Sequence, residues 1–260
     1  MKMKKILAVL MAVFMIAVCF AGCGDTKTDM QYVKDKGVLV VGITDFKPMD
    51  YQDADGNWIG FDADLAKEFA KYIGVDIKFV EIDWDNKVME LDGKTIDCVW
   101  NGMTLRDDVK TSMACSVPYC TNAQVIVVPA DKAEQYKTPE ACKDLQFAVE
   151  AGSAGKDEAA ANGFKYTEVK DQATALQEVA SGTCDAAIID LLMAGAMIGE
   201  GTGYANLTYT VSLNSEAYGV GFRKGSDLVE QFNTFFAEKL ANGEVQKIAE
   251  TYGVQEALVK

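Results

Sequence analysis

Apolar runs of strand length alternate with amphipathic segments over the first hundred residues. Three of these runs have the pattern of strands: residues 37–42, 76–82 and 96–100. Residues 62–73 carry apolar side chains on one helical face, with Asp62 as the expected N-cap and Gly74 as the stop. A short helix is expected over residues 86–91. This alternation predicts a parallel sheet with helical crossovers.

The rest of the chain repeats the alternation. Strands are expected at residues 124–128, 146–149, 166–169, 185–190 and 218–222. Helices are expected to begin at residues 137–140 and 151–156, and to span residues 172–180, 228–240 and 244–252. Two successive sets of this kind predict an α/β fold of two lobes, and 260 residues are enough for it.

The strand expected at residues 96–100 ends in an abrupt change to small and polar residues. Asn101, Gly102, Met103 and Thr104 follow Trp100 directly. Gly102 lets the backbone approach a ligand, and Thr104 offers a hydroxyl group and an amide. Ligands bind at the carboxyl ends of strands in open α/β sheets, although an Asn-Gly pair is often only a turn. We therefore take these residues as candidate ligand residues, with a core position as the alternative for Trp100.

The N-terminus has the features of an export signal. A basic start precedes an apolar run over residues 6–20, which is short for a membrane span. The small pair before Cys23 resembles a bacterial lipobox, in which the cysteine is lipidated. We expect a signal peptide over residues 1–22, a lipid on Cys23 and a polar tether over residues 23–33. A plain cleaved signal or an uncleaved anchor is the alternative.

Composition argues against several function classes. The formal net charge of −14 disfavours nucleic acid and anionic lipid surfaces as partners. The chain has no histidine, which removes histidine-based acid/base chemistry, the Ser-His-Asp triad and most zinc sites. We therefore expect no catalytic residue, no metal and no cofactor. Five cysteines follow Cys23 without a CxxC motif, and this odd number leaves at least one thiol free or paired between chains.

Several short segments occur in an order that is typical of one family. They are residues 37–42, 60–66, 82–85, 102–104 and 118–119, followed by residues 151–153, 185–190 and 218–225. Together they resemble bacterial extracellular solute-binding proteins of the polar amino acid type, from about Gly37 to Tyr252. The resemblance implies a periplasmic-binding-protein-like fold, with two lobes that close on a ligand. Each lobe would be a mainly parallel sheet flanked by helices.

The resemblance also implies where the lobes begin and end. Two crossover strands that act as a hinge would lie near residues 122–128 and 215–222. Residues 34–122 and 216–260 would then form the first lobe, and residues 123–215 the second.

Ligand residues follow from the same resemblance. The backbone and hydroxyl groups of residues 101–104 would hold the carboxylate and amine of an amino acid. Asp190 would bind the amino group. Ser153 and Ala154 open a helix, whose amides would face an anion. Phe46 would cover the ligand side chain.

Carboxylates near the expected strand ends have other interpretations. Asp190 could instead cap the helix that follows it. Asp45, Asp50 and Glu150 are expected to be solvated loop charges. If two of them line the cleft, they favour a cationic ligand.

The chain departs from the family pattern at the arginine that binds the carboxylate. Counted without gaps, that position is Val109. Arg106 lies three residues earlier, and Arg223 resembles a scaffold position. A guanidinium clamp is hard to replace with lysine. Arg106 could take the place of this arginine, or Lys156 and the helix amides could bind the anion. The third alternative is a ligand that lacks an α-carboxylate.

The resemblance implies a monomeric substrate-binding lipoprotein at the outer face of the cell membrane. It would capture an amino acid or a related small polar solute and deliver it to the permease of an ABC importer. The alternatives are an enzyme on the same scaffold, such as a dehydratase of prephenate-like substrates, or a sensor that signals through another chain.

Overall fold

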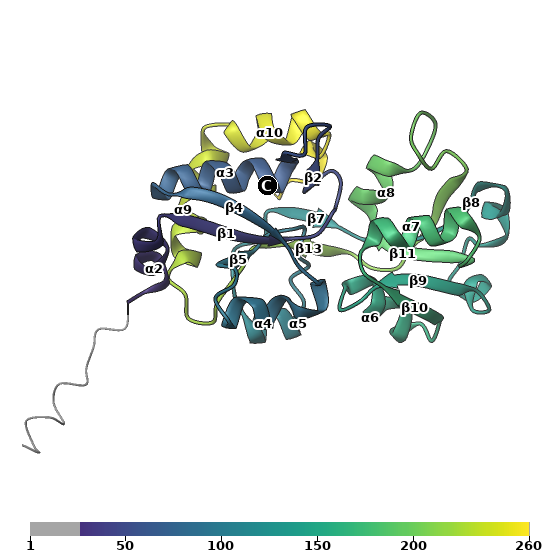
Figure 1. The fold of residues 1–260 in the computed structure, drawn as a ribbon. Coiled ribbons are helices and arrows are strands. Elements are labelled where there is room, and N and C mark those ends of the chain that lie inside the picture. Colours follow the sequence, from purple (N-terminus) through teal and green to yellow (C-terminus); the bar gives the residue numbers. More distant parts are fainter. Residues whose placement is uncertain (1–26, 260) are drawn as a thin grey trace, which may run out of the picture.

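The computed structural model describes residues 27–259, so the expected signal peptide and Cys23 lie outside the described residues. Figure 1 shows two α/β lobes side by side, with strands β7 (Cys120–Asn122) and β13 (Glu216–Tyr218) between them. These two strands pair antiparallel, with Glu216 opposite Asn122 and Tyr218 opposite Cys120. The chain therefore passes between the lobes twice, through strands that lie together.

A five-stranded sheet forms the centre of the first lobe, in the order β4-β1-β5-β14-β6. Its strands are β1 (Val38–Ile43), β4 (Asp76–Glu81), β5 (Cys98–Val99), β6 (Ala114–Cys115) and β14 (Gly221–Phe222). Strand β1 pairs parallel with β4 and β5, whereas β14 pairs antiparallel with β5 and β6. Because β14 comes from late in the chain, the first lobe contains segments from both ends of the described chain.

Helices surround this sheet (Figure 1). They are α2 (Asp29–Lys36), α3 (Phe61–Ile73), α4 (Lys87–Asp92), α5 (Asp107–Ser112), α9 (Leu228–Ala241) and α10 (Glu244–Tyr252). A hairpin of β2 (Tyr51–Gln52) and β3 (Trp58–Ile59) and the 3-10 turns Trp84–Asn86 and Gln255–Ala257 complete the lobe. Helix α3 has the expected amphipathic pattern, and its apolar face is buried.

The second lobe has a sheet in the order β10-β9-β11-β8-β12. Its strands are β8 (Gln124–Pro129), β9 (Gln146–Glu150), β10 (Lys165–Val169), β11 (Ala186–Asp190) and β12 (Leu207–Ser212). Its helices are α6 (Ala154–Ala161), α7 (Gln172–Ser181) and α8 (Leu191–Met197), with 3-10 turns at Ala130–Gln135 and Glu140–Cys142. Strand β9 pairs parallel with β10 and β11, but β8 pairs antiparallel with β11 and β12. Both sheets are therefore mixed, because the strands that enter from the crossovers run against the parallel ones.

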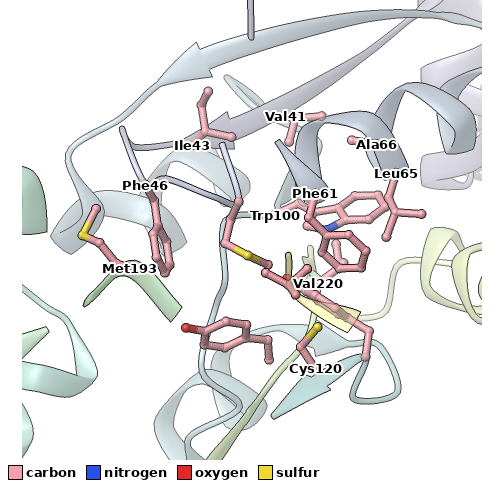
Figure 2. Packing of buried hydrophobic residues seen from close by; sticks show 14 of the residues in the cluster. Val41, Ile43, Phe46, Phe61, Leu65, Ala66, Trp100, Cys120, Met193 and Val220 are labelled. Atoms are coloured by element: carbon pink, nitrogen blue, oxygen red, sulfur yellow. The ribbon is translucent and has the colours of Figure 1, made fainter. Parts of the chain in front are cut away.

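Trp100 lies in the core of the first lobe, where Figure 2 shows it among buried side chains from several elements. Its ring is fully buried and lies 4.9 Å from that of Phe232 on α9 and 6.3 Å from that of Phe69 on α3. Edge-to-face contacts of this kind add to the free energy of burial. Trp100 thus anchors the end of β5 just before the chain turns into residues 101–104.

Several local expectations were wrong. Helix α3 is capped by Gly60 and not by Asp62, which lies inside the helix. Residues 137–140 lead only into a 3-10 turn, because the chain soon enters β9. Helix α2 begins at Asp29, so the segment expected as a tether is helical from there on. Residues 218–222 belong to two strands, since the chain passes from the crossover into the first sheet.

Candidate functional site

A small cavity lies between the two lobes and is lined by side chains of both. The first lobe lines it with Phe46, Trp84, Lys87, Asn101, Gly102, Met103, Thr104, Arg106 and Val109. The second lobe contributes Glu150, Ser153, Ala154, Gln172 and Asp190. All of the ligand residues expected from the sequence except Trp100 therefore meet at one cavity. The core packing of Trp100 explains the exception, because its ring is buried against Phe69 and Phe232.

Asn101 and Gly102 position the loop at the end of β5. The side chain of Asn101 accepts hydrogen bonds from the N–H and hydroxyl of Thr44 at 3.0 and 2.7 Å, and donates to Asp50 at 2.8 Å. Gly102 has a φ of +54°, and a Cβ here would lie 2.5 Å from the ring of Phe46. Its N–H donates to Asp62 Oδ2 at 2.7 Å. Glycine is thus required both by the backbone conformation and by the close approach of Phe46.

Asp62 does not cap α3 because its carboxylate accepts the hydrogen bond from the Gly102 N–H. Its carboxylate also accepts a hydrogen bond from the hydroxyl of Tyr119 at 2.6 Å. Burial raises the pKa of Asp62 to about 7, and the two hydrogen bonds oppose that rise. Asp50 is also fully buried, and burial raises its pKa well above the ordinary value, with the Asp62 charge adding to the rise. The expectation that Asp50 is solvated was therefore wrong.

Asp190 lies at the end of β11, where both crossover strands reach it. It accepts hydrogen bonds from Asn122 of β7 and from the Tyr218 hydroxyl of β13, each at 2.5 Å, and from Gln172. Within the described part of the chain, its side chain makes no capping hydrogen bond to α8. Burial raises its pKa to about 7, and the nearby Glu216 charge contributes to the rise. Asp190 thus connects the cavity to the strands that join the lobes.

Glu150 ends β9, the strand that pairs with β11, and so lies beside Asp190. Adjacent strands are about 4.8 Å apart, so the two carboxylates share one edge of the sheet. Glu150 is 3% exposed, and its Oε1 has no hydrogen-bond partner among the described residues. Burial raises its pKa to about 8, with Asp190 adding to the effect. The expectation that Glu150 is a solvated charge was wrong, whereas Asp45 is exposed.

Two cationic side chains of the first lobe reach across to Gly152 of the second. Lys87 Nζ donates to the carbonyl oxygens of Trp84 at 3.0 Å and of Gly152 at 3.1 Å. Arg106 donates to the same Gly152 oxygen at 3.3 Å and forms an ion pair with Asp157 at 2.9 Å. Burial, followed by the Arg106 charge, lowers the pKa of Lys87 to about 8. These contacts hold the lobes together beside the cavity.

Sequence reasoning missed Trp84, Lys87, Glu150 and Gln172 as cavity residues. For Glu150 a signal existed, since it ends a buried strand in the same way as Asp190 does. For Lys87 the only signal was its place two residues after the segment 82–85, which carried the family resemblance.

Other features of the described residues bear on the function class. No helix within residues 27–259 is long and apolar enough to cross a membrane. The same residues contain no group of three or more histidine, cysteine or acidic side chains that could hold a metal ion. Cys98, Cys115, Cys120, Cys142 and Cys184 are unpaired.

Comparison with known proteins agrees with this geometry. Residues 39–255 match the family described as bacterial extracellular solute-binding proteins, family 3. The chain is 31% identical over 255 residues to the arginine-binding extracellular protein ArtP of Bacillus subtilis. This alignment covers 95% of this chain and 96% of the relative.

Solved structures give the same result. A mutant of ArgBP from T. maritima aligns with a TM-score of 0.81 and 33% identity, covering 86% of this chain and 99% of that one. An ancestral amino acid-binding protein, described as a precursor of cyclohexadienyl dehydratase, aligns with a TM-score of 0.79 and 30% identity, covering 86% and 98%. With two α/β lobes around a cavity and a family match over nearly all of the described residues, this chain belongs to the bacterial extracellular solute-binding proteins of family 3.

Proposed function

We propose that the chain captures an amino acid or a related small polar solute in the cavity between its lobes and delivers it to an ABC importer. The observation that carries this proposal is Asp190, a buried carboxylate that faces the cavity and is hydrogen-bonded to both crossover strands. A cationic amino group at Asp190 would compensate a charge that burial otherwise disfavours. The names of the relatives support the ligand class, since they include an arginine-binding protein and an amino acid-binding protein.

The roles of the remaining cavity residues follow from their positions. Phe46 presents an aromatic ring to the cavity, and its contact with Gly102 fixes that ring beside the loop. Ser153 caps α6 by accepting from the N–H of Lys156 at 3.1 Å, so the amides of the first turn face the cavity from the second lobe. The solute would thus contact both lobes, and its binding would favour the closed arrangement.

The test is a ligand panel on the mature chain, measured by thermal shift and then by calorimetry. Common L-amino acids, their decarboxylated amines and small peptides form the panel, after partial unfolding and dialysis to remove any bound solute. We expect a saturable rise in Tm for a small subset, because a ligand that binds only the folded state stabilises it. The absence of any shift across the panel would remove this function.

An enzyme on the same scaffold is the second candidate, and Glu150 is the observation that favours it. A buried carboxyl group with a pKa of about 8 holds its proton at neutral pH, as a general acid must. We infer that Glu150 is not catalytic, because the named relatives bind solutes. Product analysis with prephenate-like substrates tests this. Turnover that Glu150→Gln abolishes would establish the enzyme instead.

We also propose that a lipid on Cys23 holds the protein at the outer face of the cell membrane. The support is the sequence alone, in which small residues before Cys23 end an apolar signal. Two acyl chains would give stable anchoring. Metabolic labelling with a fatty-acid analogue should mark the natural chain and not Cys23→Ala, which should be released. Equal label in both proteins would reject the anchor.

A further inference from the structure

Val109 stands where the family resemblance places the arginine for the ligand carboxylate, so another group of the cavity would have to bind that carboxylate. Val109 lines the cavity but is apolar and 2% exposed, so it offers nothing to an anion. Lys156 is not among the residues that line the cavity, and it pairs with Glu168 at 3.1 Å. Arg106 also lines the cavity, and the carboxylates of Asp108 and Asp157 already pair with its charge. It donates to the carbonyl of Gly152, while its buried Nη1 makes no hydrogen bond among the described residues.

Lys87 also lines the cavity, and it differs from Arg106 in having no carboxylate partner among the described residues. It is 5% exposed, and its Nζ uses two of the three N–H groups of an ammonium on the carbonyl oxygens of Trp84 and Gly152. Among the described residues, no carboxylate lies within ion-pair distance of it. A buried ammonium without a counter-ion is costly, so the third N–H is available to an anion in the cavity.

The position of Lys87 coincides with the start of helix α6. The Gly152 oxygen that accepts from Lys87 directly precedes Ser153, the N-cap, and Ala154, the first residue of the helix. The amides of the first helical turn have no partner within the helix, and here Ser153 Oγ takes only that of Lys156. Ala154, the first residue of the helix, lines the cavity together with Lys87, so its free amide lies on the same side of the cavity as the ammonium.

We infer that Lys87, together with the first amides of α6, binds the carboxylate of the solute in place of the missing arginine. This inference rests on the proposed capture of an amino acid. Since Lys87 belongs to the first lobe and α6 to the second, the carboxylate would join the two lobes. An ammonium is a point charge without the fixed fork of a guanidinium, so the site should tolerate anions of different shape.

The test combines a change in the protein with the removal of the carboxylate from the probe. The probe pairs are L-arginine with agmatine and L-histidine with histamine, each of which differs only by the carboxylate. Calorimetry compares the natural protein with Lys87→Met and Lys87→Arg, and Lys156→Met is the matched control. The melting temperature of each variant, measured first, shows that it is folded.

We expect Lys87→Met to weaken binding of the amino acids by about 10- to 100-fold, the range for a hydrogen bond to a charged partner, and to change binding of the amines far less. Lys87→Arg should restore the preference for the carboxylate, and Lys156→Met should leave it unchanged. A purely structural role for Lys87 would weaken both members of a pair equally, and this result would overturn the inference.

Other outcomes separate the inference from the proposed function. Amines that bind the natural protein as tightly as the amino acids would refute a carboxylate site but keep solute capture. A carboxylate preference that Lys156→Met abolishes would move the anion site to Lys156. If no member of the wider ligand panel binds the natural protein either, the proposed amino acid capture fails together with the inference.

Discussion

Glu150 should make the stability of the ligand-free protein depend on pH. Its carboxyl group is 3% exposed, and burial raises its pKa from 4.5 to about 8. Because the folded protein holds this proton more tightly than the unfolded chain, the stabilisation is complete below pH 4.5 and is lost as the pH rises through about 8. The change Glu150→Gln keeps the shape of the side chain and removes its charge.

The magnitude follows from the linkage between pKa and stability. Each pH unit between the unfolded and folded pKa values costs about 1.4 kcal/mol. Ionisation of Glu150 in the unfolded chain therefore lowers the free energy of unfolding by up to about 3 kcal/mol at pH 7. At pH 5 the loss is below about 1 kcal/mol by the same relation. Any cost of placing a carboxamide in the cavity is the same at both pH values and cancels in the difference. Asp62 titrates in both proteins and cancels as well, whereas the Asp190 charge acts on Glu150 and is therefore part of the measured difference.

The assay is urea unfolding of both proteins at pH 5, 7 and 8 after removal of bound solute. We expect the free energy of unfolding of Glu150→Gln, minus that of the natural protein, to be larger at pH 7 and 8 than at pH 5. Glu168→Gln is the matched control, since it makes the same change at an exposed glutamate of the same lobe. A difference between the two proteins that is equal at all three pH values would refute the reasoning.

Three further predictions concern binding. Asp190→Asn should weaken the binding of a ligand with an amino group by roughly 2–5 kcal/mol while the protein stays folded. Unchanged affinity by calorimetry would contradict the role of Asp190. Val109→Arg should raise the preference for α-amino acids over their amines, measured on the same ligand panel; an unchanged ratio would show that a guanidinium at this position does not reach the ligand. Gly152→Ala should weaken binding by about tenfold, because Gly152 has a φ of +67° and a Cβ would lie 2.5 Å from Asp85 Oδ1 and 2.8 Å from its Cα across the lobes. Its ligand-free melting temperature should change little if the effect is on closure, whereas a large drop would indicate strain within the second lobe.

The architecture could be predicted from the sequence because its signals are local. The periodicity of residues 62–73 and the apolar run at residues 37–42 report burial without knowledge of any distant partner. Family resemblance then named Phe46, Ser153 and Asp190, and the structure places them at one cavity. These residues lie at strand ends or helix starts, which a two-lobe fold brings to the same edge.

Only the tertiary structure decided which neighbours of those residues face the cavity. Trp100 and Asn101 are adjacent in the sequence, yet one packs on Phe232 and the other lines the cavity, since successive side chains near a strand end point to different sides. Asp62 has the sequence signature of a helix cap, but its carboxylate accepts hydrogen bonds from the N–H of Gly102 and the hydroxyl of Tyr119. These two donors lie far from Asp62 in the sequence, so local propensity does not predict them.

The tertiary structure also decided which charged side chains are buried at the cavity. Lys87 has no periodicity that separates it from a solvated surface charge, yet it is buried where its ammonium reaches Gly152 of the second lobe. Whether a charged side chain is buried depends on what covers it, and here the cover is a lobe formed by another part of the chain. The sequence by itself thus determined the two lobes and the residues at their strand ends, whereas the contact between the lobes decided which charges face the solute.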